Sequence, residues 1–217
     1  MPDRELLDEQ IAYYRARAAE YDATSTVDGD PFAEHTARIR SALDAFAPSG
    51  RALELAAGTG QWTGQLAEHA DKLLVTDASP EMLELNRARV GQRANVRRRV
   101  ADAFALEPTH GHDVVFFGFF LSHVPPSRFG AFWSGVEGVL APGGRVFFVD
   151  EAAHGLWEED WVDRDAGVTR RTLSDGSVHR AVKVLWRPDE LAATLRTLAW
   201  DASVQQEGPF YHGMARR

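Results

Sequence analysis

The residues best suited to chemistry follow a short apolar segment, 52–56, which ends at a glycine-rich turn. Gly58 and Gly60 come next, and a helix is predicted to begin near Trp62. Glycine has no Cβ, so a ligand can lie against the backbone, and the first turn of a helix offers unpaired N–H groups. The pattern is typical of a nucleotide-type site at the end of the first strand of an α/β sheet, although a tight strand-to-helix turn has the same signature.

Three acidic residues lie in or just after three successive predicted strands, namely Glu54, Asp77 and Asp102. Asp77 comes 19 positions after Gly58, and an acid about 20 residues beyond such glycines is the expected partner of a ribose diol. Each acid alone could be a helix cap. Because the carboxyl ends of neighbouring parallel strands share one edge of a sheet, we expect the three carboxylates to face one crevice.

The residues after the glycines argue against a dinucleotide. A dinucleotide fingerprint has a third glycine three positions after the second, where the pyrophosphate meets the helix. Here that position is Thr63, and Gln61 and Trp62 place bulk where a pyrophosphate would lie. The loop therefore favours a ligand that has adenosine and ribose but no phosphates.

These segments resemble the class I S-adenosylmethionine-dependent methyltransferases, in the small-molecule branch that includes quinone and natural-product enzymes. The resemblance runs from about Tyr13 to the C-terminus and is carried by residues 13–22, 52–63, 75–83, 100–106, 113–126 and 140–152. It implies an α/β fold, a Rossmann-like, doubly wound, seven-stranded and mostly parallel sheet whose last strand is antiparallel. It also implies S-adenosyl-L-methionine as cofactor and S-adenosyl-L-homocysteine as product.

The resemblance implies roles for individual residues. Gly58 and Gly60 would let the methionine moiety pass, and Asp77 would hold the ribose. Asp102 would accept a hydrogen bond from the adenine amino group, and Met82 would lie against the adenine face. The expected donor-binding set is Tyr21, Glu54, Ala56, Gly58, Gly60, Trp62, Asp77, Ser79, Met82, Asp102, Ala103, Phe104 and Phe119.

Two further features complete the implied cofactor site. Tyr21 would close over the methionine end, and the backbone of Ala103 would lie beside the adenine. One departure from the family is the pair Ala56 and Ala57, where members often have Asp or Cys. Contacts made there by a side chain must come from the backbone or from elsewhere.

His123 is the expected catalytic residue, because it lies where the central strand opens onto the crevice. A hydroxyl or ammonium acceptor must lose a proton, and histidine is the commonest general base. His123 could instead cap the helix that follows Pro125. The expected acceptor-binding set is Tyr14, His123, His154, Trp157, Trp186 and Tyr211, which predicts an apolar or aromatic substrate with an oxygen, nitrogen or carbon acceptor.

The elements that must position these residues alternate along the chain. Helices are expected at 5–20, 31–46, from 62, from 80, 125–140 and from 188; strands are expected at 52–56, 73–76, 96–100, 114–120, 145–149, 178–186, 202–206 and 209–214. Alternating strands and helices indicate a mainly parallel sheet. We expect one domain, 1–217, in which helices within 1–48 cover the active site and 151–177 form a lid or insertion.

Composition excludes several other classes. The chain has 217 residues, a net charge of −8 and no cysteine, so disulfides, thiolate zinc sites and cysteine nucleophiles are absent, and no histidine and acid spacing predicts a metal. No apolar run reaches the roughly 18 residues of a membrane span. The arginine cluster within 87–99 lacks interleaved aromatic residues, so nucleic-acid binding is not expected. We expect a bacterial, cytoplasmic enzyme with a small-molecule substrate, as a monomer or homodimer.

Two other functions are compatible with parts of the pattern. A nicotinamide-dependent oxidoreductase is disfavoured by Thr63 and by the lack of a Tyr-x-x-x-Lys pair in a chain with two lysines, Lys72 and Lys183. A non-catalytic protein with a cofactor-type fold could bind a partner through the acidic segment 151–165, which contains Trp157 and Trp161.

Overall fold

A computed structural model describes residues 2–21, 31–153 and 159–217. The main sheet consists of β1 (Arg51–Leu55), β2 (Lys72–Asp77), β3 (Val96–Val100), β4 (His112–Gly118), β5 (Leu140–Glu151), β9 (Asp201–Glu207) and β10 (Phe210–Arg216). Its order is β3-β2-β1-β4-β5-β10-β9. All pairs are parallel except those of β10, which runs antiparallel to both β5 and β9. The predicted seven-stranded, mostly parallel sheet with an antiparallel last strand is confirmed.

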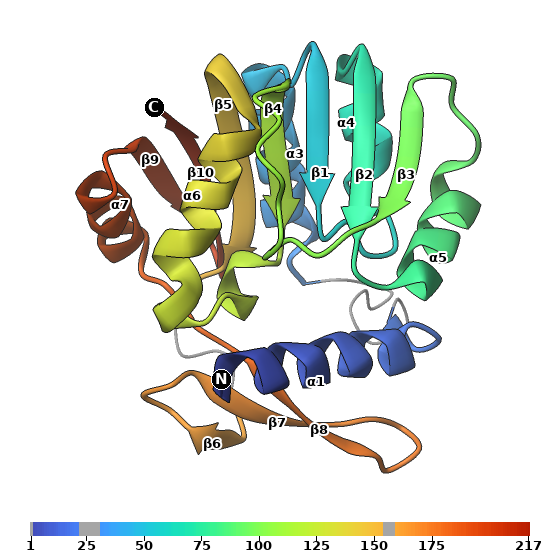
Figure 1. Ribbon diagram of the computed structural model, residues 1–217, viewed down its shortest axis with the longest axis vertical. Coiled ribbons are helices and arrows are strands. Elements are labelled where there is room, and N and C mark those ends of the chain that lie inside the picture. The colour runs from blue at the N-terminus through green and yellow to red at the C-terminus, as the bar shows by residue number, and fades with distance from the viewer. Residues whose placement is uncertain (1, 22–30, 154–158) are drawn as a thin grey trace.

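Helices cover both faces of this sheet. They are α3 (Ala33–Phe46), α4 (Thr63–His69), α5 (Pro80–Val90), α6 (Phe129–Val139) and α7 (Pro188–Thr197). In the view of Figure 1, α3 and α4 lie behind the sheet and α6 lies in front of it. Two hydrophobic clusters fill the two interfaces, and the central strand β4 contributes to both of them.

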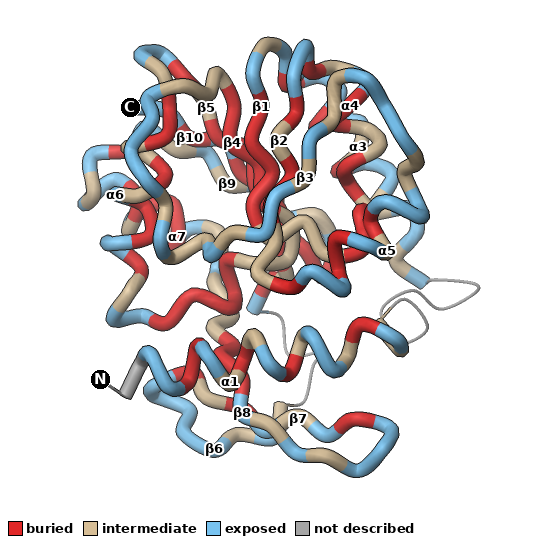
Figure 2. Tube along the Cα trace, turned by 45° about the vertical axis from the view of Figure 1, so that its right-hand side comes forward, coloured by how far each residue is buried: buried red, intermediate tan, exposed pale blue. Residues whose placement is uncertain are grey.

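The packing of β4 shows why its sequence is apolar without alternation. Phe116 points to the α3 and α4 side and stacks on Phe147, whereas Phe117 points to the α6 side and meets Trp133 edge-on. A strand that is buried on both faces needs apolar residues at consecutive positions. Figure 2 shows the buried residues running along the central strands of the sheet.

A second layer lies beyond the carboxyl ends of the parallel strands. It contains α1 (Pro2–Arg17) and a three-stranded antiparallel sheet of β6 (Trp161–Asp163), β7 (Val168–Thr172) and β8 (Val178–Val182). Figure 1 shows α1 lying between the strand ends and this small sheet. Glu9 of α1 accepts hydrogen bonds from the backbone and side chain of Arg180 on β8, so helix and small sheet are joined.

Several element boundaries differ from those expected. The helix predicted to start at Pro125 begins at Phe129, after two short 3₁₀ turns, η1 (Leu121–His123) and η2 (Pro126–Arg128). The strand expected to run to Trp186 ends at Val182, where its pairing with β7 ends. Within the described residues, no helix is long and apolar enough to cross a membrane.

Candidate active site

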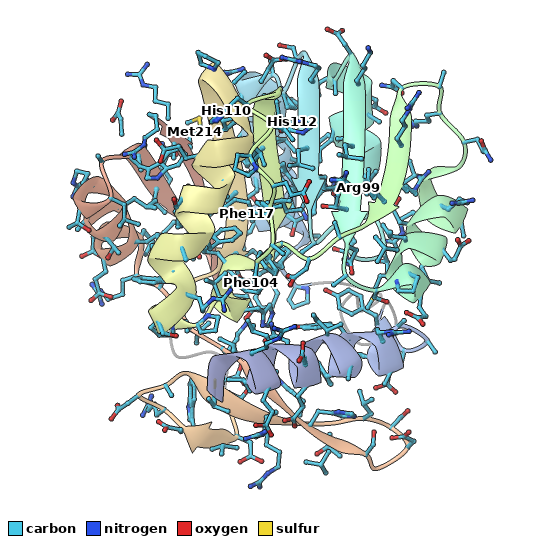
Figure 3. All side chains as sticks on the ribbon, in the orientation of Figure 1. Arg99, Phe104, His110, His112, Phe117 and Met214 are labelled. Carbon is cyan, nitrogen blue, oxygen red and sulfur yellow. The ribbon has the colours of Figure 1, made fainter. Side chains whose placement is uncertain are left out.

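A cavity lies at the carboxyl end of the main sheet, under α1. One side is formed by the segments that follow β1, β2, β3 and β4, and α1 supplies the other side. Twelve of the predicted site residues line it: Tyr14, Tyr21, Ala56, Gly58, Asp77, Ser79, Met82, Asp102, Ala103, Phe104, Phe119 and His123. Figure 3 shows Phe104 at the end of the sheet that faces α1.

Asp77 joins two segments of the cavity wall. Its Oδ2 accepts a hydrogen bond from the backbone N–H of Gly58, and its Oδ1 accepts one from that of Ser79, both at 2.8 Å. Ser79 caps α5 by accepting a hydrogen bond from the backbone N–H of Met82. Burial raises the pKa of Asp77, and the backbone donors at Ser79 and Gly58 oppose that shift. A carboxylate has about four lone-pair sites, so Asp77 can also accept from a ligand hydroxyl in the cavity.

The backbone of the glycine-rich turn leaves room for a ligand. Gly58 has φ +52°, and a Cβ built on it would meet nothing within 4 Å, so the space beside it is open. Gly60 has φ +89°, and a Cβ there would lie 2.9 Å from the side chain of Asn86. Ala56 and Phe119 also have positive φ, at +49° and +53°. These non-glycine residues line the cavity, and such strained backbone is found disproportionately at binding sites.

A series of hydrogen bonds holds the glycine-rich turn on the side away from the cavity. The Arg98 Nε donates to Asn86 Oδ1 at 2.7 Å, Asn86 Nδ2 donates to the Thr63 hydroxyl at 2.7 Å, and that hydroxyl donates to Glu54 Oε2 at 2.7 Å. The four residues belong to β3, α5, α4 and β1, so the chain crosses four elements under the loop. Burial raises the pKa of Glu54 to about 8.

The opposite wall of the cavity carries a tyrosine and histidine pair. Tyr14 Oη lies 2.8 Å from His123 Nε2, and His123 Nδ1 lies 2.7 Å from the carbonyl oxygen of Val182. A carbonyl oxygen can only accept, so Nδ1 carries the proton and Nε2 accepts the hydrogen bond from the Tyr14 hydroxyl. Burial is the main reason that the pKa of His123 lies well below its usual range, and the nearby positive charge of Lys183 lowers it further.

A buried polar cluster supports His123 from outside the cavity. Lys183 forms an ion pair with Glu151, and its Nζ lies 3.4 Å from the hydroxyl of Ser122. Asp150 accepts hydrogen bonds from the backbone N–H groups of Ser122 and Glu151, each at 2.7 Å. Burial raises the pKa of Asp150 to about 6. The turn that carries His123 is therefore held by the end of β5.

Five predicted site residues among those the structure describes lie outside the cavity lining: Glu54, Gly60, Trp62, Trp186 and Tyr211. Glu54 and Trp62 were expected in the cofactor site, but Glu54 lies beneath the turn, and Trp62 packs at 5% exposure against Phe116 with Arg40 over its ring. The correction for Glu54 follows from strand alternation, which turns its side chain toward the α4 side of the sheet.

The predicted aromatic wall of the acceptor site is also corrected. Trp186 packs on Phe129, with ring centroids 5.0 Å apart, and Tyr211 is fully buried against Phe148. Both belong to the core around α6, because their strand-end positions face the helix layer instead of the cavity. His154 and Trp157, which were predicted to bind the acceptor, lie outside the described residues.

Sequence reasoning placed Tyr14 of α1 in the site but missed its neighbours on the same helix. Leu7, Gln10 and Ile11 line the cavity together with Tyr14. Their spacing of three and four residues places them on one helix face, and that spacing was the available signal. Within the described residues, no group of three or more His, Cys, Asp or Glu side chains could hold a metal ion.

Comparison with known proteins agrees with this geometry. The family described as "Methyltransferase domain" matches residues 52–144. The structure of a DhpI–SAH complex is 39% identical, with a TM-score of 0.80, over 97% of this chain and 96% of that one. A DhpI–SAM–HEP complex is 38% identical over 98% of each chain, with a TM-score of 0.83. The chain belongs to the S-adenosylmethionine-dependent methyltransferases.

Two curated relatives match part of this methyltransferase. Nodulation protein S of Rhizobium tropici is 28% identical over 127 residues, which are 56% of this chain and 52% of that protein. Phosphoethanolamine N-methyltransferase 1 of Arabidopsis thaliana is 30% identical over 105 residues, 47% of this chain and 21% of that protein. The methyltransferase thus spans about half of the first relative and about a fifth of the second.

The cavity of the methyltransferase fits the family's donor, S-adenosylmethionine, and its product, S-adenosylhomocysteine. The open space at Gly58 admits a ligand against the backbone, and the Asp77 carboxylate, which lines the same cavity, is an acceptor suited to a ribose hydroxyl. One oxygen of Asp102 accepts a hydrogen bond from the backbone N–H of Phe104, and the other oxygen can accept from an amino group. These features suit the methyl donor of the family to which the chain belongs.

Proposed function

We propose that this enzyme methylates an oxygen or a nitrogen of a small molecule, and that Tyr14 and His123 together remove the proton from that atom. The observation that carries the proposal is the 2.8 Å contact between Tyr14 Oη and His123 Nε2, since both side chains line the cavity that holds Gly58 and Asp77. An acceptor carbon without an acidic proton would have no need of such a pair.

Donor binding is assigned to the strand ends. Asp77 would hold the ribose, Asp102 and the backbone at Ala103 would hold the adenine, and Met82 would lie against the adenine face. Tyr21, Gly58 and Phe119 would surround the methionine end; all of these residues line the cavity. When bound, S-adenosylmethionine supplies a methyl group on a sulfonium, which is attacked in line with the breaking C–S bond.

Proton removal follows from the fixed tautomer of His123. The Tyr14 hydroxyl donates to Nε2, so an acceptor proton that moves to Tyr14 Oη displaces the phenolic proton onto the histidine. Burial of His123 keeps it neutral and ready to accept. The neighbouring α1 residues Leu7 and Ile11 exclude water from the same space, and holding an acceptor in place is itself worth about 7 to 11 kcal/mol.

The proposal is tested by Tyr14→Phe and His123→Asn. Both variants should bind S-adenosylmethionine within about threefold of wild type in calorimetry. Turnover of alcohol and amine acceptors, followed with labelled donor, should fall by about 10² to 10⁴-fold, the usual contribution of a positioned general base. His69→Asn, at the exposed end of α4 beside Asp44, is the matched control. Wild-type turnover in both active-site variants would overturn the proposal.

We also propose the setting in which the enzyme acts. It would work in the cytoplasm of a bacterium, as a monomer or homodimer with no nucleic-acid partner. The net charge of −8, the absence of cysteine and the similarity to a rhizobial protein support this setting. The chain would act as one domain, 1–217, in which α1 and the small sheet of β6, β7 and β8 cover the active site.

A further inference from the structure

Gln10 closes a ring of hydrogen bonds around the proposed base. Its Nε2 donates to the carbonyl oxygen of His123 at 3.2 Å, and its Oε1 accepts from the N–H of Val182 at 2.8 Å. His123 Nδ1–H in turn donates to the carbonyl oxygen of Val182 at 2.7 Å. Gln10 is 4% exposed and lines the cavity. The ring therefore joins three segments that are far apart in the sequence.

The chemistry of each partner fixes the direction of every bond in the ring. The Val182 N–H can only donate, so the Gln10 oxygen must face it, and the amide nitrogen then faces the His123 carbonyl. The Val182 carbonyl can only accept, so His123 must be protonated at Nδ1. If the proton moved to Nε2, the bare Nδ1 and the Val182 carbonyl would face each other without a hydrogen atom between them, and a buried acceptor would be unpaired.

The ring couples the tautomer of His123 to the position of α1 and β8 over the strand ends. Gln10 and Tyr14 lie four residues apart, on one face of α1, and both contact His123. Val182 is the last residue of β8, and His123 ends the 3₁₀ turn after β4. If α1 leaves the strand ends, His123 loses its partner at Nε2 and the Val182 N–H loses its acceptor, whereas the Val184 N–H still donates to the carbonyl of Ser122 at 2.7 Å.

We propose that Gln10 is a positioning residue that holds His123 in the Nδ1–H tautomer, so that the base is competent only while α1 and β8 are docked against the end of β4. The inference rests on the proposed function, because it assigns His123 the role of base. Gln10 acts through Val182 and the His123 backbone and moves no proton itself.

The tautomer, and not the charge, is the property that Gln10 controls. Tyr14 and Arg17 from α1, Arg171 from β7 and Lys183 after β8 all face His123, and together with burial the three cations favour a neutral ring by lowering its pKa. A neutral imidazole has two tautomers, and only the one with a bare Nε2 can accept the proton of Tyr14. A change in tautomer would therefore remove the base without a change in charge.

The test compares Gln10→Leu, which removes both side-chain hydrogen bonds, with Gln10→Glu, which can still accept from Val182 but cannot donate to His123. The imidazole nitrogens of ¹⁵N-histidine enzyme are observed by NMR, and the His123 signals are assigned by their loss in His123→Asn. Wild type should show the Nδ1–H tautomer. Gln10→Leu should show a mixture or the Nε2–H form, and turnover should fall by about 10- to 100-fold, with donor affinity within about threefold.

Gln65→Leu is the matched control. Gln65 also bridges two segments, by donating to the carbonyl of Arg40 and to Asp44, but it lies on α4 away from His123. The control should lose thermal stability without a change in the His123 spectrum or in turnover. Retention of the Nδ1–H tautomer and of wild-type turnover in Gln10→Leu would overturn the inference; if that variant does not fold, the same criteria apply to Gln10→Glu. Full activity in His123→Asn would overturn the proposed function, whereas the NMR result would still decide the role of Gln10.

Discussion

Asp77 shows how one side chain can build a site and also serve in it. Both of its oxygens accept backbone N–H groups, one from the glycine turn and one from the start of α5. The carboxylate therefore sets the distance between two walls of the cavity before any ligand enters. Its remaining lone pairs point to a use in binding, because a buried carboxylate is stable only when its oxygens are well supplied with donors.

Asp77→Asn should weaken donor binding strongly. The new amide NH₂ would face either the Gly58 or the Ser79 N–H, so one backbone donor loses its acceptor and one ligand hydroxyl loses a charged partner. Hydrogen bonds to charged groups are worth about 1.5 to 3 kcal/mol each, so the dissociation constant of S-adenosylmethionine in calorimetry should rise by about 100-fold or more. Asp113→Asn, at the amino end of β4 where Asp113 contacts the Arg51 N–H, should leave affinity unchanged. Equal affinities in the two variants would contradict the ribose assignment.

Sequence spacing correctly placed Asp77 and His123 at the cavity but could not identify their hydrogen-bond partners. The distance of 19 residues from Gly58 to Asp77 is a local signal of a strand, helix and strand unit. Gln10 lies 113 residues from His123, and no local pattern links a glutamine in a helix to a strand end so far along the chain. Trp186 was misplaced for a related reason, since a residue near a strand end can face either the cavity or a covering helix.

At the scale of elements, the hydrogen-bonded chain from Arg98 to Glu54 ties four elements to the glycine turn. Asn86 is its central member, because it is fully buried, contacts both Arg98 and Thr63, and packs against Gly60. The turn is thus held by Asp77 on the cavity side and by Asn86 on the opposite side.

Asn86→Leu should lower both stability and donor affinity. The substitution leaves the Thr63 hydroxyl and Arg98 without their buried partner, at a cost of about 1 to 3 kcal/mol for each group, and it releases Gly60. Asn95→Leu is the control: Asn95 donates to the carbonyls of Ala67 and Ala70 and has no contact with the turn. The unfolding temperature should be lower than that of wild type in both variants. Calorimetry should show weaker donor binding for Asn86→Leu alone. Equal donor affinities in the two variants would show that the hydrogen bonds from Arg98 to Glu54 do not position the glycine turn.

Element prediction was most direct where burial imposes an apolar pattern on the sequence. The central strands β1, β2 and β4 are buried on both faces, and their apolar runs located them within a few residues. The strands β6 and β7 were not predicted, because they are only three and five residues long and β7 reads Val-Thr-Arg-Arg-Thr. The backbone of β7 pairs with β6 and β8, and no local apolar pattern in its sequence announces that pairing.

At the scale of the whole molecule, the fold carries buried acids whose protonation is linked to unfolding. Glu54 is buried and accepts a hydrogen bond from the neutral Thr63 hydroxyl, and burial raises its pKa from 4.5 to about 8. The pKa values of Asp77 and Asp150 are raised as well, that of Asp150 to about 6. In each case burial disfavours the charged form, so the folded protein keeps protons that the unfolded chain releases.

Glu54→Gln should flatten the pH dependence of stability. Between pH 4.5 and 8 the unfolded chain has lost the Glu54 proton and the folded protein has kept it, so wild-type stability falls as pH rises through this window and levels off above it. The slope from this one group is at most about 1.4 kcal/mol per pH unit.

The variant keeps an oxygen that accepts from Thr63 and has no proton to lose, so its advantage in stability over wild type should grow from about pH 5 to pH 8. Urea unfolding across that range measures the difference, and Glu68→Gln, exposed on α4, should follow wild type throughout. Parallel curves for wild type and Glu54→Gln would show that Glu54 is ionised in the folded protein.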